Sequence, residues 1–470
     1  MNPPATVPEG LNSPVPGESV CLRVAGLADA SGFSAVPGSM LIRADGPGRL
    51  AVLAAGSQTE VAGHPESAKA RVLDLGRSVV LPALVNAHTH LDLTHVGPRP
   101  FDVGAGFVGW VDMVRRERLA DADAIGRSVR AGVALGREGG VAAVGDIAGC
   151  PSSGPQAAGA MELAQSGMRG VSFVEFFGIG RGRERGLPGA IRAIEAASGR
   201  VSAEAEEPGV RLGLQPHAPS TVSLRVYESA LAVRGLALST HLAETPEEHE
   251  FIATGRGPQR DLLERIGAWD DVILEEVGKG LTPVMHVAGV LAGAKGRDRR
   301  ESIMLVHVND CGDEDLETLA SVRRSGVNLF VVYCPRASAY FRAADTFGPH
   351  RYKEMLARGI PVALGTDSVI NLSMEDLAQG LSTWGEMRLL YHRDGVDPAV
   401  LLAMSTTMGA SALGFSPEAF LFTRTGPIAG LIAVETGELR PDDDPIRVGL
   451  TSGKPARFLF NNNESCLAET

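Results

Sequence analysis

The sequence predicts an α/β protein, a (β/α)8 TIM barrel with a small composite β-sandwich domain formed from the N- and C-terminal segments. The main observation is an alternation in the middle of the chain, where short apolar runs are separated by longer segments with a helical pattern. Strands that alternate with helices form parallel sheets, and eight such units close into a barrel. The apolar runs lie at residues 79–90, 141–149, 171–178, 210–220, 236–245, 302–310, 327–335 and 360–368.

The two ends of the chain have a different pattern. Short strand-like pieces separated by Gly and Asp turns occupy residues 19–80 and 420–470, which we expect to pair into the composite β-sandwich. Residues 81–419 then form the barrel, and its longest gap, 243–301, is expected to be an insertion with more than one helix. Residues 1–18 contain much Pro, Ser and Gly and are predicted to be a flexible tail.

The composition argues against several classes of protein. The 470 residues include 56 acidic and 44 basic side chains, a formal net charge of -12, which disfavours nucleic acid or an anionic membrane as the partner. We find no apolar run long enough to span a bilayer and no signal peptide. The five cysteines form no CxxC pair, so we expect neither a disulfide framework nor a zinc knuckle. Such cysteine usage fits a reducing compartment, and we expect a cytoplasmic location.

Histidines gather where the predicted strands end. His88 and His90 close the first run, and alternate residues of a strand point to the same side. Catalytic residues of such barrels sit at the C-terminal ends of the strands. Asp367 ends the eighth run, and five of the eleven histidines end runs, namely His88, His90, His217, His241 and His307. Unrelated surface histidines would rarely fall there together, so we interpret the pattern as a metal site.

The proposed ligands are His88, His90, His241 and Asp367. Three imidazoles and one carboxylate suit Zn²⁺ or Fe²⁺, whereas Mg²⁺ prefers mostly oxygen ligands. A metal with an open position lowers the pKa of its water toward ~7, which predicts hydrolytic attack on an electrophilic carbon. The histidine pair alone would be a weak signal, because short motifs often match by chance.

Two further residues are candidate catalytic groups. Glu244 lies three residues after His241, where it can shuttle protons beside the metal; alternatively, it only begins a helix. His307 could orient the water or polarise the substrate, against the alternative of a buried histidine with satisfied hydrogen bonds. His217 lies farther around the rim and is a candidate for contact with the substrate.

Other candidate substrate-binding residues have weaker support. Glu175 could contact the substrate or cap the next helix. Trp110 either lines the pocket or belongs to the core. Arg336 could pair with a substrate carboxylate, although a loop arginine is more often solvated. Asp146 is interpreted as structural, and no function is assigned to His350.

Several motifs are together typical of one family. The segments "PALVNAHTH", "QPHAPS", "HLAETPEEHEF", "LVHV", "CPRASAYF" and "ALGTDS" resemble the amidohydrolase superfamily, and within it the branch of cytosine deaminases and triazine hydrolases. The fourth run has no lysine, whereas binuclear relatives often carry a carboxylated lysine there. The resemblance therefore implies one divalent metal, Zn²⁺ with Fe²⁺ as the alternative. It also implies a homodimer. It implies metal ligands and catalytic groups at His88, His90, His241, Asp367, Glu244 and His307.

Within this branch, the segment 106–118 and "CPRASAYF" resemble aminodeoxyfutalosine deaminases, which act in an alternative menaquinone pathway. That resemblance implies attack on C6 of a 6-aminopurine nucleoside and release of ammonia. Glu244 would protonate N1, Asp367 would accept a proton from the water, and His307 would stabilise the developing charge.

Three alternatives stay open. One is deamination of S-adenosylhomocysteine, adenosine or guanine. Another is a hydrolase that releases chloride or an amine from a triazine-like ring, or that cleaves an amide. The third is a non-catalytic binding protein on a barrel scaffold, since a fold does not dictate a function. The segments "LVHVND", "CPRASAYF" and "GTDSVINL" depart from the usual pattern of the branch. These departures concern the choice of substrate more than the metal site.

Overall fold

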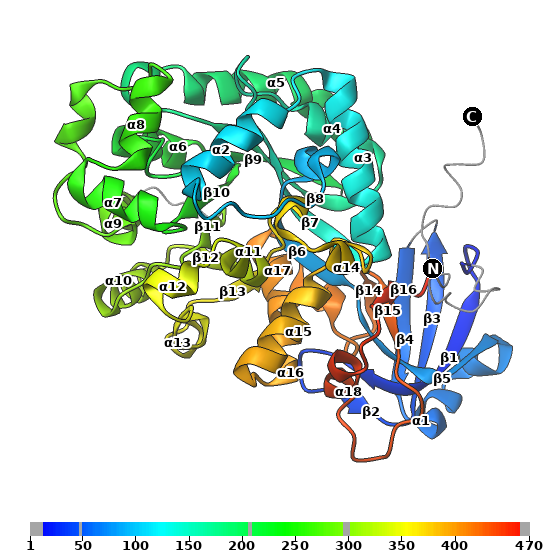
Figure 1. Cartoon of the computed structure of the whole chain (residues 1–470). Coiled ribbons are helices and arrows are strands. Elements are labelled where there is room, and N and C mark those ends of the chain that lie inside the picture. Colours follow the sequence, from blue (N-terminus) through cyan, green and yellow to red (C-terminus); the bar gives the residue numbers. More distant parts are fainter. Residues whose placement is uncertain (1–12, 47–48, 205–208, 295–300, 461–470) are drawn as a thin grey trace.

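The computed structural model describes residues 13–46, 49–204, 209–294 and 301–460 (Figure 1). Within this part, a large body of alternating strands and helices carries a smaller β domain at one side, coloured blue and red. Residues 1–12 of the predicted tail and residues 461–470 of the predicted C-terminal segment lie outside the described residues. The end of the predicted tail is bound to the small domain, because the Gly17 amide donates to the Ala44 carbonyl over 2.7 Å.

Eight parallel strands form the large body and confirm the predicted barrel. Each predicted run overlaps one strand of this barrel, and each strand pairs with the next one along the chain. A parallel bridge between Thr89 and Asp367 joins the first strand to the segment after the last. The strands are β6 (Leu84–Thr89), β7 (Val141–Ala148), β8 (Arg169–Phe176), β9 (Val210–Pro216), β10 (Ala237–Leu242), β11 (Ile303–His307), β12 (Leu329–Tyr333) and β13 (Val362–Leu364).

Helices surround the barrel because its strands are apolar on both faces. In α3, the Asp121 side chain caps the first turn, and Ile125, Val129 and Val133 recur at four-residue spacing on the buried face. The helices that follow the strands are α3 (Ala122–Glu138), α4 (Ala158–Gln165), α5 (Gly186–Glu204), α6 (Leu224–Ala232), α9 (Pro283–Gly293), α10 (Asp313–Arg324), α13 (Tyr352–Ala357), α15 (Thr383–Asp394), α16 (Pro398–Met404) and α17 (Thr407–Ala412).

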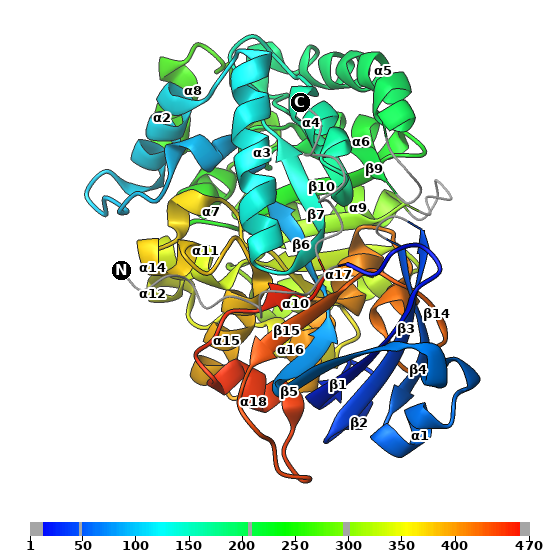
Figure 2. The ribbon, with the colours of Figure 1, turned by 90° about the vertical axis from the view of Figure 1, so that its right-hand side faces the viewer.

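Short helices and turns lie among the loops that follow the strands. The predicted insertion, 243–301, contains several of these short elements. One of them, α8, contacts α2 through an ion pair of 2.7 Å between Arg265 on α8 and Asp112 on α2 (Figure 2). These elements are η2 (Leu91–Val96), α2 (Gly106–Glu117), η3 (Gly180–Gly182), α7 (Pro246–Thr254), α8 (Pro258–Arg265), η4 (Asp271–Glu275), α11 (Pro335–Tyr340), α12 (Ala343–Phe347), η6 (Val369–Asn371), α14 (Met374–Leu377) and η7 (Pro417–Phe420).

The two ends of the chain meet in a second sheet, as predicted. Its order is β14-β4-β3-β1-β5-β15-β16, with β2 beside β1, so the C-terminal β15 pairs directly with the N-terminal β5. The elements are β1 (Ser19–Ala28), β2 (Ser34–Ala35), β3 (Gly38–Gly46), β4 (Arg49–Gly56), α1 (Gln58–Ala62), η1 (Pro65–Lys69), β5 (Arg71–Pro82), β14 (Gly426–Ile428), β15 (Leu431–Glu435), α18 (Pro445–Thr451) and β16 (Arg457–Phe458).

The first predicted run, 79–90, differs from a single strand. It belongs to both sheets, because β5 continues to Pro82 beside β15 and β6 begins at Leu84 beside β7. Proline has no amide hydrogen for a sheet, which favours a change of partner at this point. One apolar run therefore connects the small domain directly to the strand that carries His88.

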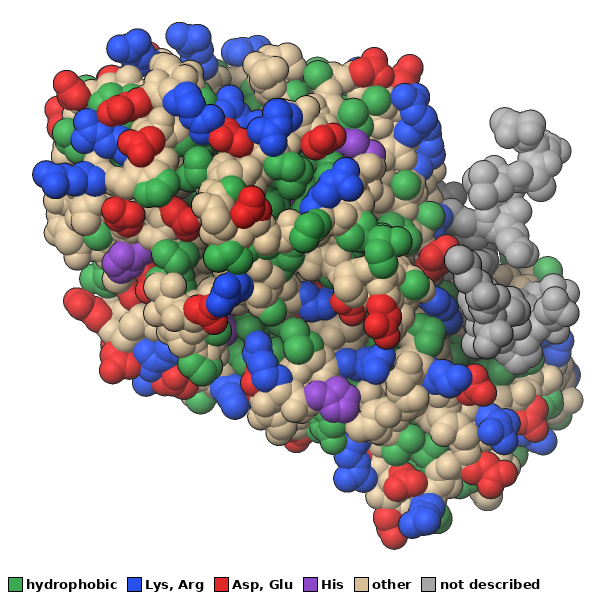
Figure 3. All heavy atoms as spheres, in the orientation of Figure 1, with side chains coloured by type: hydrophobic (Ala, Val, Ile, Leu, Met, Phe, Trp, Pro, Cys, Tyr) green, Lys and Arg blue, Asp and Glu red, His purple; other side chains and the backbone are tan. Residues whose placement is uncertain are grey.

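The surface mixes charges of both signs. Figure 3 shows Lys and Arg side chains interspersed with Asp and Glu side chains over the face seen in Figure 1. Among the residues described, no helix has the length and the apolar character that a membrane crossing requires.

Candidate metal centre

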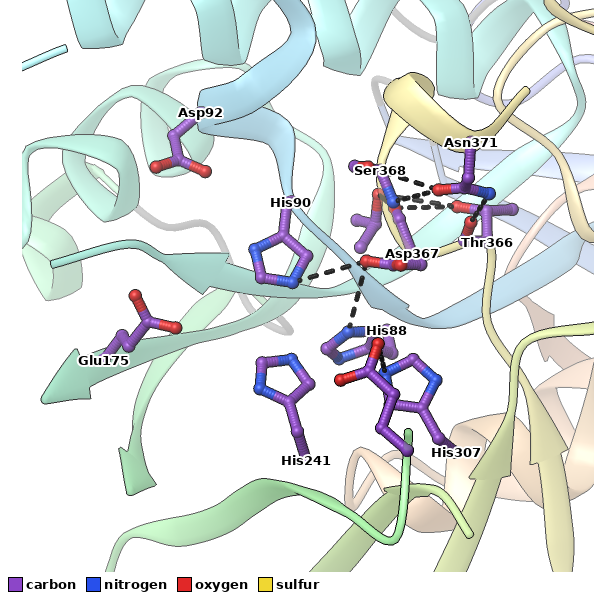
Figure 4. A network of polar contacts seen from close by, with 12 residues as sticks. His88, His90, Asp92, Glu175, His241, His307, Thr366, Asp367, Ser368 and Asn371 are labelled. Carbon is purple, nitrogen blue, oxygen red and sulfur yellow. Dashed lines mark hydrogen bonds and ion pairs between the residues drawn. The ribbon is translucent and has the colours of Figure 1, made fainter. Parts of the chain in front are cut away.

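The four predicted metal ligands lie together at the C-terminal end of the barrel (Figure 4). His88 lies in β6 and His90 follows it, His241 lies in β10, and Asp367 follows β13. Asp367 Oδ1 is 3.5 Å from His90 Nε2 and 3.8 Å from His88 Nε2. One nitrogen from each of the three histidines lies within 4.8 Å of the others. We call these four residues the ligand group.

The ligand group fits a metal ion. His88 is fully buried, and neither of its ring nitrogens has a hydrogen-bond partner among the residues that the structure describes. Burying polar nitrogens without a partner is costly, so the site favours an added ligand. Burial holds the pKa of His88 and His90 well below the usual range and that of His241 at about 3, which keeps the imidazoles in their metal-binding neutral form. Three nitrogens and one carboxylate suit Zn²⁺ or Fe²⁺.

Contacts with the backbone orient these side chains. His241 Nδ1 donates to the His217 carbonyl over 3.1 Å, which leaves Nε2 as the nitrogen for a metal. Asp367 has a positive φ of 58°, a conformation that is uncommon outside glycine and concentrates at functional sites. The Thr89 hydroxyl donates to the Asp367 carbonyl over 2.9 Å, and the Asp367 amide donates to the His88 carbonyl over 3.1 Å. The closure of the barrel thus holds the carboxylate in place.

Glu244 and His307 form a pair beside the ligand group. Glu244 Oε1 lies 3.4 Å from His307 Nε2, and these two residues each place one polar side-chain atom within 4.8 Å of Asp367. Burial, and then the carboxylates of Asp367, Glu248 and Glu247, raise the pKa of Glu244 well above its usual range. A carboxyl group with a raised pKa can carry a proton at neutral pH, as an acid catalyst must.

The backbone around Glu244 is tied to the loop after β11. Asn309 Nδ2 donates to the Glu244 carbonyl over 3.0 Å, and the Glu248 carboxylate accepts from the Glu244 amide over 2.9 Å. The Asp310 amide donates to the Ala243 carbonyl over 3.0 Å. The loop that carries Glu244 is therefore linked to the loop that follows His307.

An ion-pair network lies on the other side of the ligand group. Arg118 Nη1 is 3.2 Å from Asp92 Oδ2 and 3.3 Å from Glu175 Oε2. The Cys150 amide also donates to Glu175 Oε2, over 2.9 Å. We call Asp92, Arg118 and Glu175 the arginine network. Glu175 also clusters with His217 and His241, but the positive charge of Arg118 disfavours a second metal ion there.

The remaining predicted substrate contacts lie in different surroundings. The ring of His217 is 5.1 Å from that of His241, so His217 borders the ligand group. Trp110, on α2, packs in an aromatic cluster, 5.6 Å from the Phe107 ring and 5.1 Å from the Phe341 ring. The structure does not bring Arg336 to the ligand group through any contact it describes.

The contacts of Arg336 lie on α14, on α15 and on the residue before α15, and they include an ion pair of 3.5 Å with Asp376. Its Nε donates to Glu386 Oε1 over 2.5 Å, and its Nη2 donates to the Ser382 carbonyl over 3.0 Å. Glu386 is fully buried, and a buried carboxylate needs a charged partner. The contacts of Arg336 thus support a structural role and give no support to the predicted substrate contact.

Sequence reasoning missed four residues around the site. Asn309 and Glu248 lie within four residues of His307 and Glu244, and that proximity was the signal available. Arg118 and His350 had no local signal, because their partners lie on distant segments.

Comparisons with known proteins agree with this geometry. The amidohydrolase family matches residues 79–448. The chain is 31% identical over 398 residues to an aminodeoxyfutalosine deaminase of Deinococcus radiodurans, covering 79% of this chain and 82% of that protein. It is 28% identical over 387 residues to a 5-methylthioadenosine/S-adenosylhomocysteine deaminase of Moorella thermoacetica, covering 79% and 77%.

The fold comparison points the same way. A crystal structure of Helicobacter pylori aminofutalosine deaminase matches with a TM-score of 0.67 at 18% identity, over 94% of this chain and 98% of that chain. At that identity the match shows a shared fold. The family match and the Deinococcus relative cover most of the chain, so this protein belongs to the amidohydrolase family.

Proposed function

We propose that the protein is a metal-dependent hydrolase that deaminates a 6-aminopurine nucleoside and releases ammonia. The observation that carries the proposal is the Glu244–His307 pair, at 3.4 Å, beside the ligand group. Deamination needs a proton donor for the ring and for the leaving amine next to an activated water. The similarity to purine nucleoside deaminases supports this substrate class.

The residues divide the work as follows. A bound divalent cation would supply the Lewis acidity that lowers the pKa of the attacking water. The Asp367 carboxylate lies 3.5 Å from His90 and 3.8 Å from His88, where it can accept a proton from that water. Glu244 delivers its proton to the ring nitrogen N1, then takes the proton of the added hydroxyl group and passes it to the departing amine. Asp367 finally returns the first proton of the water to Glu244. Neutral His307 stabilises negative charge on the incoming oxygen. Water and the 6-amino compound thus give the 6-oxo compound and ammonia.

The proposal extends to finer points. Zn²⁺ is the proposed metal, because three imidazoles and a carboxylate suit it. We also propose aminodeoxyfutalosine as the substrate and a role in menaquinone biosynthesis. A cytoplasmic location and a homodimer are proposed as well. A 5-methylthioadenosine or S-adenosylhomocysteine substrate is the second candidate, supported by the similarity to the Moorella protein.

Ammonia release from a panel of substrates tests the proposal. The panel contains aminodeoxyfutalosine, S-adenosylhomocysteine, 5-methylthioadenosine, adenosine, guanine and an aminotriazine, each added to zinc-loaded protein. We expect release from a purine nucleoside and its loss on addition of a chelator. No release from any 6-aminopurine nucleoside by metal-replete protein would reject the proposal.

Replacing Glu244 tests its role as the proton shuttle. Glu244→Gln removes the transferable proton, so kcat should fall by ~10²- to 10⁴-fold while the bound metal is retained. Glu250→Gln is the matched control, because Glu250 is exposed on α7, the helix that begins two residues after Glu244. Unchanged turnover in Glu244→Gln would exclude Glu244 as the shuttle.

A further inference from the structure

The backbone of His307 has an unusual conformation. His307 has a φ of 74° and Val308 a φ of 53°, both in the left-handed region that side chains other than glycine rarely adopt. Such strain persists only where the surroundings impose it. The imidazole that faces Glu244 therefore depends on whatever holds this peptide.

One side chain binds that peptide directly. His350 Nε2 lies 2.8 Å from the His307 carbonyl oxygen. The Tyr352 amide donates to His350 Nδ1 over 3.0 Å, so Nδ1 is an acceptor without a proton. In a neutral imidazole the other nitrogen then carries the hydrogen. His350 Nε2–H must therefore donate to the His307 carbonyl.

His350 is itself held rigidly. Its ring stacks on Tyr333 with centroids 3.7 Å apart, and the residue is 8% exposed. The Tyr333 hydroxyl accepts from Arg393 over 3.2 Å, and the Tyr352 hydroxyl donates to Asp394 over 2.7 Å. Burial lowers the pKa of His350 to about 4, so it stays neutral at physiological pH. The Tyr333 ring and the Tyr352 amide thus hold the donor against the His307 carbonyl.

We propose that His350 is a positioning residue, whose Nε2–H holds the His307 peptide in its left-handed conformation and so aims the His307 imidazole at Glu244. This role rests on the proposed function, since it gives His307 its catalytic orientation. His350 contacts no predicted ligand of the metal in the described structure, so metal binding should not depend on it.

Two substitutions separate the hydrogen bond from packing. His350→Phe keeps a ring against Tyr333 but loses both the donor to the His307 carbonyl and the acceptor of the Tyr352 amide. We expect a kcat at least ~10-fold lower, with KM and metal content unchanged, because loss of one buried hydrogen bond and a small misplacement have effects of this order. His350→Gln carries an amide N–H near the position of Nε2 and should restore kcat to within ~3-fold of the wild type.

Tyr333→Phe is the matched control. It removes the hydroxyl that binds Arg393 but keeps the stacked ring and the His350–His307 bond, so kcat should change by less than ~2-fold. Equal kcat in His350→Phe and the wild type would overturn the proposal. A His350→Gln protein no more active than His350→Phe would also overturn it.

Structural measurements test the role independently of the substrate. In a crystal structure of His350→Phe, we expect the φ of His307 to leave the left-handed region; retention of that φ would refute the role. A long-range ¹H–¹⁵N spectrum of the wild type should show His350 protonated at Nε2, and protonation at Nδ1 would contradict the positioning role. This spectrum tests the role even if His350→Phe does not fold. A wild-type protein without deaminase activity would reject the proposed function, but the crystal structure and the spectrum would still test the role of His350.

Discussion

The ligand group and the arginine network are both buried at the same end of the barrel, yet their polar atoms are satisfied differently. In the ligand group, both nitrogens of His88 and Nδ1 of His90 have no partner within the described protein. In the arginine network, Arg118 pairs with both carboxylates and Cys150 adds a backbone donor, so that of its buried side-chain polar atoms only Asp92 Oδ1 has no hydrogen-bond partner among the described residues. Unpaired buried nitrogens indicate where a ligand binds, and a paired ion network indicates a frame that holds the loops.

The largest expected effect comes from removing a ligand. His88→Ala should abolish metal binding and lower turnover by ~10³-fold or more, because the metal supplies several kcal/mol of stabilisation to the reaction. Without metal, His88→Ala and the wild type should have similar melting temperatures, because the His88 ring makes no hydrogen bond within the described residues. Metal analysis and ammonia release check the first expectation, and thermal unfolding with a chelator checks the second. Retention of metal would exclude His88 as a ligand.

The opposite result is expected in the arginine network. Arg118→Met leaves two buried carboxylates without a cation, which should lower the free energy of unfolding by ~3–5 kcal/mol. The double variant Arg118→Met/Glu175→Gln should recover part of that loss, because it removes one of the unpaired charges. Urea unfolding measures both. An Arg118→Met protein as stable as the wild type would show that the network does not hold the frame.

A pH-dependent effect is expected for Asp146, which borders the arginine network. Its carboxylate accepts from the Leu91 amide and the Ser172 hydroxyl, each over 3.1 Å. Burial, and then the charge of Asp92, raise the pKa of Asp146 from 3.8 to about 7. Between these values the folded protein binds a proton that the unfolded chain has released, so stability falls as the pH rises through this window.

The measurement compares the wild type with Asp146→Asn, which cannot titrate. The difference in free energy of unfolding, wild type minus variant, should fall by up to ~1.4 kcal/mol per pH unit between pH 4 and pH 7 and level off above. A difference that is independent of pH would contradict the raised pKa of Asp146.

Local patterns in the sequence were sufficient for the frame of the site. The apolar runs predicted all eight barrel strands, because a buried parallel strand is a short apolar segment whatever its partners are. The ligand group followed from that frame, since parallel strands place their C-terminal ends at one rim. The run 79–90 was the exception, because nothing local shows that it passes from one sheet to the other at Pro82.

By itself, then, the sequence determined the barrel, the terminal β domain and the residues that meet as the ligand group. Only the tertiary structure decided which polar groups pair across long separations. Arg118 meets Glu175, Arg336 meets Glu386, and His350 meets the His307 carbonyl, over separations of 57, 50 and 43 residues. Periodicity reports which face of an element is buried, but a partner of a buried charge or carbonyl is chosen by the closed barrel, which brings distant loops within hydrogen-bond distance.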